Sequence, residues 1–415
     1  MRFWHAFADM AALEAGGEFV VDRGEGVHVW GEDGRRYLDA TGALWYCMVG
    51  WGRTEIADAA AAQMRKLASY STFGDYSNRP AIELAERLAA IAPMAEAKVF
   101  LTSGGSDSID TATKMARRYW QLVGEPDRTV LITRERSYHG MHVAGTSLAG
   151  IPANAAGYGD LVGDVAKVPW DSPEALRAAI DEAGPGRVAA FFCEPIVGAG
   201  GVYPPPPGYL EAVRAICRET GVLFVADEVI TGFARTGAWF ASTRWALDPD
   251  LITCAKGLTS GYLPMGAVIA SPRIAEPFWR PGAGLFRHGY TYSGHATVAA
   301  AALANLAIIE REDLAGRALA LETELATGLA PLADHALISE VRSGVGVLAA
   351  VQIAAEAIAA DATLPARAAA ACRANGVLTR ALGSGGLQVS PALVLDAAGI
   401  AEMAAGIAAG LDAVA

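Results

Sequence analysis

Lys256 is a residue whose type and setting could do chemistry. It follows the apolar residues 251–255 (LITCA), in a chain that has five lysines and twenty-eight arginines. Burial lowers the pKa of an ammonium group, and a lysine without its proton can act as a nucleophile and form a Schiff base. Arginine cannot do this because it stays protonated. The alternative is a structural lysine with a buried stem and its charged head in solvent.

Asp227 stands in a similar place, directly after the apolar residues 222–226 (VLFVA). A carboxylate at the end of a buried strand needs a partner, because an unpaired buried charge is costly. The partner could be a structural arginine or the protonated ring nitrogen of a cofactor.

A glycine-rich turn follows a third apolar run, residues 97–102 (AKVFLT). Gly104 and Gly105 allow close approach of the backbone to a ligand, and Ser106 could cap the helix that follows. Exposed amides at a helix N-terminus suit a phosphate group. An ordinary strand-to-helix turn is the alternative. The chain has no G-x-x-x-x-G-K-[ST] phosphate loop, and this turn lacks the third glycine of a dinucleotide fingerprint.

The elements that position these residues form an alternating pattern. Apolar runs of strand length occur at residues 97–102, 129–133, 188–195, 222–228, 251–256 and 265–270, with helical segments that include residues 173–183 and 208–220. Continuous apolar strands that alternate with helices indicate a mostly parallel sheet sandwiched by helices, an α/β fold. Ligands bind at the carboxyl ends of the strands in such sheets.

The two ends of the chain have a different sequence pattern. Residues 1–55 resemble short strands separated by turns, and short strands also occur among alanine-rich helices at residues 344–353, 376–380 and 387–390. We therefore expect a large cofactor domain at residues 56–305. A smaller α+β domain is expected to combine residues 1–55 with residues 306–415.

Composition excludes several function classes. The net charge of −12 argues against nucleic acid as a partner, and the longest apolar run, residues 295–310, is too short to span a membrane. Five cysteines without metal-like spacing and the lack of a signal peptide predict a reducing cytoplasm. No acidic residue stands beside His139 and His142 as in a zinc motif, so we expect no metal, and the two histidines could be a satisfied structural pair.

The lysine, the carboxylate and the glycine-rich turn together match the needs of pyridoxal phosphate. Its aldehyde condenses with a lysine, its ring nitrogen needs a carboxylate and its phosphate suits a helix N-terminus. With these residues, the chain resembles the class III aminotransferases, which are fold type I pyridoxal phosphate enzymes. The segments ADEVITGFARTG and AKGLTSGYLPMGAV carry the resemblance, which extends over nearly the whole chain.

The resemblance implies a role for individual residues. Lys256 takes the place of the Schiff-base lysine, and Asp227 that of the partner of the ring nitrogen. Further cofactor contacts are implied for the phosphate binders Gly105 and Ser106, for Tyr138 and Val229 on the two ring faces, and for Thr291, which would bind the phosphate held by the neighbouring subunit. A homodimer is therefore implied, with a tetramer left open. Tyr138 could instead be a core residue. Gly257 and Gly261 are expected to make room for the cofactor.

Two departures from the family pattern are informative. The first motif has Asp107 and Ile109 where the family usually has Glu and Asn, which leaves the backbone amides unaffected but puts the side-chain contacts of Asp107 in question. Ala199 stands where members that act on ornithine-like substrates with 2-oxoglutarate have a glutamate. This resembles the amine–pyruvate (ω-transaminase) branch, in which Arg380 takes the place of a mobile arginine that binds the substrate carboxylate. Trp45 is either a wall of the substrate pocket or a core residue.

The expected function is ping-pong transamination of a primary amine or ω-amino acid with pyruvate through a Lys256 aldimine, with (S) selectivity. Pyridoxamine phosphate would carry the amino group in the second half-reaction. An aminomutase or a decarboxylase of the same fold is the alternative within the cofactor class. A nucleotide-dependent oxidoreductase and a binding protein without catalysis are alternatives from other classes.

Overall fold

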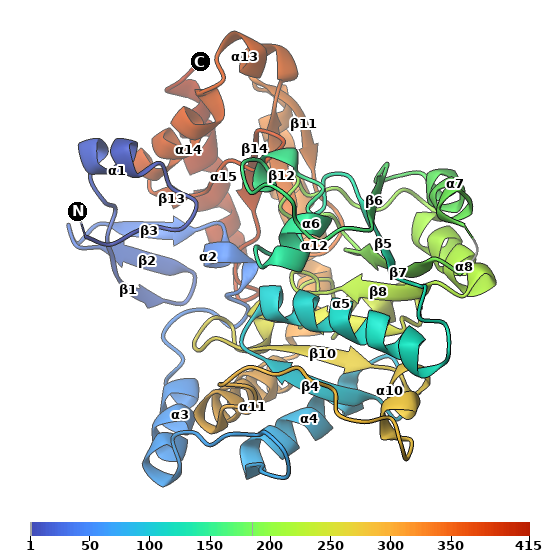
Figure 1. The fold of residues 1–415 in the computed structure, drawn as a ribbon. Helices are drawn as coiled ribbons and strands as arrows, with labels where there is room; N and C mark the ends of the chain where they lie inside the picture. The colour runs from blue at the N-terminus through green and yellow to red at the C-terminus, as the bar shows by residue number, and fades with distance from the viewer. Residues whose placement is uncertain (1, 185) are drawn as a thin grey trace.

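The computed structural model describes residues 2–184 and 186–415, which form a central sheet of seven strands and two smaller sheets (Figure 1). The strand order of the central sheet is β4-β10-β9-β8-β7-β5-β6. All neighbouring pairs are parallel except the two that involve β10, which runs antiparallel to β4 and to β9. The strands are β4 (Lys98–Thr102), β5 (Val130–Arg134), β6 (Val165–Val168), β7 (Val188–Cys193), β8 (Leu223–Asp227), β9 (Leu251–Cys254) and β10 (Gly266–Ala270).

Alternate residues of these strands enter two separate cores. Leu131, Phe192 and Val225 pack on one face together with residues of helix α5 (Gly105–Leu122). Their neighbours along the same strands, among them Ile132 and Phe224, point to the other face and enter the larger core. Every residue of β7, β8, β9 and β10 is buried, as expected for strands covered on both sides. The mostly parallel sheet sandwiched by helices is confirmed.

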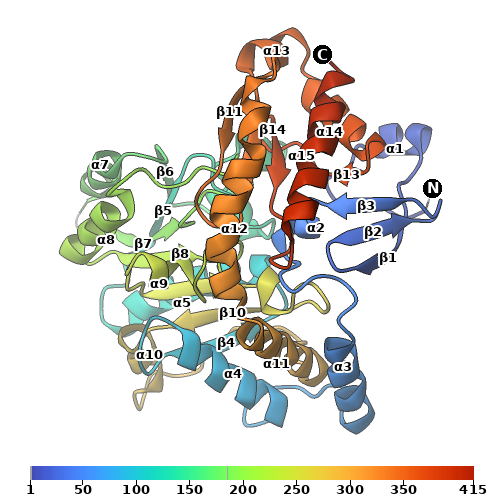
Figure 2. The same cartoon turned by 180° about the vertical axis from the view of Figure 1, so that it is seen from behind.

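Helices occupy both faces of the central sheet. In Figure 1, α5 crosses in front of the sheet, and Figure 2 shows α4, α11 and α12 from behind. The helices of this part are α3 (Thr54–Lys66), α4 (Arg79–Ile91), α5, α6 (Val143–Leu148), α7 (Pro173–Ala183), α8 (Tyr209–Thr220), α9 (Ala241–Arg244), α10 (Pro272–Trp279) and α11 (Ala296–Arg311), with the short 3-10 helices η1 (Pro152–Asn154) and η2 (Lys256–Leu258).

The two chain ends combine in one small sheet. Its order is β1-β2-β3-β13, and β13 from the C-terminal part pairs in parallel with β3, with Val377 opposite Leu38. A second small sheet has the order β11-β12-β14. The strands are β1 (Val21–Glu25), β2 (His28–Gly31), β3 (Arg36–Asp39), β11 (Ile338–Arg342), β12 (Ala349–Ile353), β13 (Val377–Leu378) and β14 (Gly386–Val389). The expected α+β region from both chain ends is confirmed, while the boundaries 1–55, 56–305 and 306–415 stay predictions.

Helices also accompany these two small sheets. They are α1 (Met10–Gly16), α2 (Gly42–Trp45), α12 (Leu314–Leu329), η3 (Ala330–Asp334), α13 (Ala355–Ala360), α14 (Leu364–Ala374) and α15 (Ala397–Asp412). Figure 2 shows α12 and α15 side by side, and the two helices contact each other.

The structure differs from the expected elements at a few positions. Strands β6 and β11 were not expected, since their sequences, VAKV and ISEVR, have neither a continuous apolar run nor a regular alternation, and they are only partly buried. Helix α8 begins at Tyr209 rather than at residue 208, because Gly208 is its N-cap with a φ of 77°. Among the described residues, no helix has both the length and the hydropathy to cross a bilayer.

Candidate functional site

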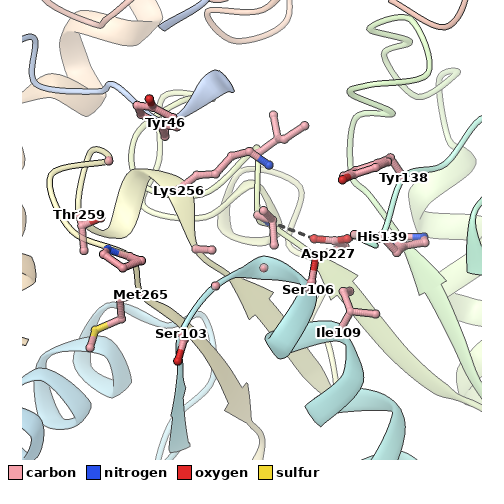
Figure 3. A pocket seen from close by; sticks show the side chains of 18 of the residues that line it. Tyr46, Ser103, Ser106, Ile109, Tyr138, His139, Asp227, Lys256, Thr259 and Met265 are labelled. Atoms are coloured by element: carbon pink, nitrogen blue, oxygen red, sulfur yellow. Dashed lines mark hydrogen bonds and ion pairs between the residues drawn. The ribbon is translucent and has the colours of Figure 1, made fainter. Parts of the chain in front are cut away.

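A cavity of about 410 Å³ opens where strands β4, β8 and β9 reach their carboxyl ends (Figure 3). Such a volume is in the range of small-molecule sites, roughly 300–1,000 Å³. The cavity is lined by six of the residues expected from the sequence, which are Gly105, Ser106, Tyr138, Asp227, Val229 and Lys256. Residues from four separate parts of the chain therefore meet at the predicted edge of the sheet.

Lys256 extends into this cavity (Figure 3). Burial lowers the pKa of its ammonium group to about 8, although Asp227 and Glu194 act in the opposite direction. Among the described residues, Nζ of Lys256 has no hydrogen-bond partner. The backbone of Lys256 has a φ of 43°, which is uncommon for a residue other than glycine and typical of functional sites. Lys256 is half-buried, and its side chain borders the cavity rather than the closed core.

The partner of Asp227 is a histidine rather than an arginine. Oδ2 of Asp227 lies 2.7 Å from Nδ1 of His139, and Oδ1 accepts hydrogen bonds from the Val229 amide (3.1 Å) and the Thr253 hydroxyl (3.2 Å). His139 and Asp227 are 1% and 4% exposed. His142 has a carboxylate partner of its own, since its Nδ1 lies 3.3 Å from Oδ1 of Asp107, so the two histidines do not contact the same group.

The glycine-rich turn leads directly into helix α5. The N-cap of α5 is Gly104, and no side chain accepts a capping hydrogen bond there. The expectation that Ser106 caps this helix is therefore wrong. Oγ of Ser106 accepts a hydrogen bond from the Met141 amide at 3.1 Å and thereby joins the turn to the loop after Tyr138. The first amides of a helix have no acceptor within the helix. Those of α5 are therefore free to bind an anion in the cavity.

Close packing explains why residue 105 is a glycine. A Cβ atom at Gly105 would lie 3.0 Å from Cγ1 of Val229, so any side chain would push Val229. Asp107, the departure from the family pattern, accepts a hydrogen bond from the Ser103 amide at 3.1 Å and lies beside His142. Its carboxylate therefore stabilises the turn itself.

Glu194 is a buried site residue that sequence reasoning missed. Its Oε1 accepts from the Tyr138 amide and its Oε2 from the Gly198 amide, each at 2.9 Å. Burial raises the pKa of Glu194, and His139 opposes this shift. The residue follows β7 directly, so the rule that singled out Asp227 and Lys256 at strand ends could have found it.

Trp45 and Arg380 lie next to the cavity. The Arg380 guanidinium is 4.5 Å from the centre of the Trp45 ring, and Nζ of Lys256 is 5.8 Å from the same centre. Trp45 is 3% exposed and packs with Ile196 and Ile230, so it is a core residue that also faces two cations. Within the described part of the chain, its Nε1 has no hydrogen-bond partner.

The expectation that Gly257 makes room for the cofactor is wrong, and Thr291 lies outside the cavity lining. A Cβ atom at Gly257 would meet Met48 at 2.6 Å, and one at Gly261 would meet the Tyr46 ring at 2.2 Å. Gly257, which does not line the cavity, therefore makes room for Met48 rather than for the cofactor, whereas Gly261 lines the cavity together with Tyr46, so its expected role stays a prediction. Thr291 is exposed and is not among the residues that line this cavity.

The residues of the cavity fit pyridoxal phosphate. A lysine with a lowered pKa, a carboxylate fixed by three hydrogen bonds and free helix amides surround one volume. Glycine at position 105 keeps open the approach between the helix and Val229. No group of at least three His, Cys, Asp or Glu side chains in the described residues could hold a metal ion.

Fold and site together define a fold type I pyridoxal phosphate enzyme. A family model described as "Aminotransferase class-III" matches residues 11–411. The chain belongs to the class III aminotransferase family, whose members exchange amino groups between small-molecule amines and keto acids and are typically dimeric.

Aminotransferases of known type are similar to this chain over almost their full lengths. A putrescine–pyruvate aminotransferase of Pseudomonas aeruginosa is 40% identical over 422 residues, covering 96% of this chain and 91% of the relative. An (S)-enantioselective ω-transaminase of Thermomicrobium roseum has a TM-score of 0.94 and 36% identity, with 99% of this chain and 96% of that chain covered.

A third relative was solved with a form of the cofactor. The ω-transaminase of Pseudomonas jessenii in complex with PMP has a TM-score of 0.93 and 32% identity, with 99% of this chain and 96% of that chain covered. The comparisons give no support to the aminomutase, decarboxylase and oxidoreductase alternatives.

Proposed function

We propose that this aminotransferase moves an amino group from a primary amine or ω-amino acid to pyruvate, by a ping-pong mechanism and with (S) selectivity. The observation that carries the proposal is the position of Arg380, whose guanidinium faces the same Trp45 ring as Nζ of Lys256. A keto acid held by Arg380 would have its carbonyl group near the lysine. The putrescine–pyruvate and (S)-enantioselective relatives support this choice.

Pyridoxal phosphate, when bound, supplies a ring that takes up the electrons released when the substrate carbon loses its proton. Lys256 is the base that removes this proton and later returns it as an acid. Because burial lowers its pKa to about 8, Lys256 can exchange a proton near neutral pH. Asp227 would hold the proton of the ring nitrogen, and Gly105 and Ser106 would hold the phosphate through their amides. Tyr138 and Val229 would enclose the ring.

Arg380 would select the acceptor by its charge. Burial lowers the pKa of Arg380, but a guanidinium starts so high that it stays protonated. Ala199 offers no carboxylate to compete for it, and the Ala199 carbonyl instead accepts a 3.4 Å hydrogen bond from the Gly383 amide. A substrate carboxylate could then bind to Arg380 in a bidentate manner.

Thr291 would act in a dimer. Its exposure and its distance from the cavity lining of its own chain support a role at the site of the partner subunit. The active site would then be complete only when two subunits associate.

An amine panel with pyruvate as acceptor tests the proposal, with alanine and the matching ketone or aldehyde measured together. Equal amounts of both products are expected. Release of carbon dioxide, or product without an acceptor, would instead indicate a decarboxylase or a mutase.

The Arg380→Ala variant tests the acceptor assignment. The KM for pyruvate should rise roughly 10- to 100-fold, because pyruvate would lose its charge-assisted hydrogen bonds to the guanidinium. The KM for 1-phenylethylamine, which has no carboxylate, should change much less. Equal increases for both substrates would contradict the role of Arg380.

A further inference from the structure

Arg380 and Gln388 face each other across a tight turn. The backbone amide of Gln388 donates to the backbone carbonyl of Arg380 at 3.0 Å. The next pair toward the turn, Ala381 and Leu387, forms an antiparallel β-bridge. On the same face, Nε of Arg380 donates to Oε1 of Gln388 at 2.6 Å. The turn therefore holds the arginine side chain against the glutamine side chain.

The orientation of the Gln388 amide group is determined by its other partners. Nε2 of Gln388 donates to Oγ of Ser390 at 2.6 Å and to the Thr41 carbonyl at 3.2 Å. The Ser390 hydroxyl itself donates to the Thr41 carbonyl at 2.8 Å, so it accepts from Gln388. Gln388 and Ser390 are fully buried. A rotated amide group would therefore lose two acceptors, and Oε1 must face Arg380.

Gln388 thus holds Arg380 without cancelling its charge. The neutral amide oxygen of Gln388 accepts the hydrogen bond of the Arg380 Nε group. The two Nη groups of Arg380 have no hydrogen-bond partner in the part of the chain that the structure describes. Two free donors on one edge of a guanidinium are the arrangement that binds a carboxylate in a bidentate manner.

We propose that Gln388 is the positioning residue that sets the keto-acid preference of this enzyme, because it presents Arg380 to the acceptor carboxylate with its full charge. The inference rests on the proposed role of Arg380. A carboxylate in place of the Gln388 amide group would form an ion pair with Arg380 and compete with the substrate for it.

Gln352 provides a matched control on the neighbouring strand. Its Oε1 accepts from Nη2 of Arg342 at 2.6 Å, so it makes the same kind of contact. Arg342, however, also donates to the carbonyls of Gly201 and Val202 and pairs with Glu340. Gln352→Glu therefore places the same new charge in the same small sheet, beside an arginine that has other partners.

The test uses holoenzyme converted to its amino form and measures the second half-reaction in single turnovers. Pyruvate is compared with propanal, an aldehyde without a carboxylate, so that general damage affects both. Gln388→Glu should raise the pyruvate concentration needed for half-saturation roughly 10- to 100-fold, because the new carboxylate competes with pyruvate for one charge-assisted contact. Half-saturation for propanal should stay within about twofold, because this acceptor makes no such contact with Arg380. Gln352→Glu should leave the ratio between the two acceptors unchanged.

If Gln388→Glu does not fold, Gln388→Met replaces it. This variant removes the acceptor of Nε without adding charge, so pyruvate should bind more weakly while the rate at saturation is retained. Equal effects on pyruvate and propanal, or an unchanged ratio, would overturn the role of Gln388. The Arg380→Ala variant separates the two proposals. If the proposed function is correct, this variant must weaken the binding of pyruvate more than that of propanal, whatever the role of Gln388.

Discussion

Nδ1 of His139 lies 2.7 Å from Oδ2 of Asp227, and its Nε2 lies 3.1 Å from Oγ1 of Thr133. Because an ionised carboxylate only accepts hydrogen bonds, Nδ1 carries the hydrogen and donates it to Asp227. The histidine therefore holds a buried carboxylate in place at the edge of the cavity, and both residues belong to its lining (Figure 3).

His139→Leu should separate this support from simple packing. Loss of the donor leaves Oδ2 of Asp227 buried without its partner, which should lower the free energy of unfolding by about 2–4 kcal/mol. It should also weaken binding of the cofactor. His139→Asn keeps an N–H donor near the position of Nδ1 and should recover most of both losses. Urea denaturation and titration of the apoenzyme with pyridoxal phosphate measure the two effects. Equal losses in both variants would show that the donor is unimportant.

Gly105→Ala should weaken cofactor binding through Val229. The added Cβ atom would lie 3.0 Å from Cγ1 of Val229, a residue of the cavity lining, so Val229 would have to shift. We expect an increase of about tenfold in the dissociation constant of pyridoxal phosphate, the equivalent of about 1.4 kcal/mol. Gly163→Ala is the control, because no atom lies within 4 Å of its added Cβ and Gly163 does not line the cavity. A weaker cofactor complex in the control alone would contradict this explanation.

The apoenzyme should react with pyridoxal phosphate in a pH-dependent manner. The pKa of Lys256 is lowered to about 8, so the neutral, nucleophilic amine is the minor form below that pH and the major form above it. The recombination rate, followed by visible absorbance, should rise with pH and level off above about 8, whereas an ordinary lysine would level off near about 10.4. Lys256→Ala should show no turnover and no such absorbance change. A rate that still rises beyond pH 9 would contradict the lowered pKa.

Mixed dimers should reveal which subunit Thr291 serves. If it serves the partner's site, a dimer of one Lys256→Ala subunit and one Thr291→Ala subunit has one intact site, with Lys256 from the second subunit and Thr291 from the first. Mixing two weakly active variants should therefore restore activity, up to one active site per mixed dimer. Lys256→Ala mixed with Asp227→Ala is the control, since both residues belong to the same chain's cavity and one wild-type site cannot form. No recovery in the first mixture would assign Thr291 to its own subunit or to no site.

Sequence reasoning succeeded where the signal was local. Lys256 and Asp227 each end an apolar strand, and the strands of a parallel sheet bring their carboxyl ends to one edge. It failed where the partner lies far along the chain. The pair of His139 and Asp227 spans 88 positions, and nothing near either residue indicates the other. Gly257 was misassigned for the same reason, because Met48, which packs against it, comes from a distant segment.

The sequence by itself determined the α/β fold, the edge of the sheet at which the site lies and the residue types available there. Apolar periodicity and strand-end chemistry are properties of short segments, so they can be read without coordinates. Only the tertiary structure decided which groups satisfy one another: His139 and Asp227, Glu194 and the backbone amide of Tyr138, and Gln388 and Arg380. These contacts depend on distance and orientation within a packed interior, where each buried polar group must find its partner among residues that the chain order keeps apart.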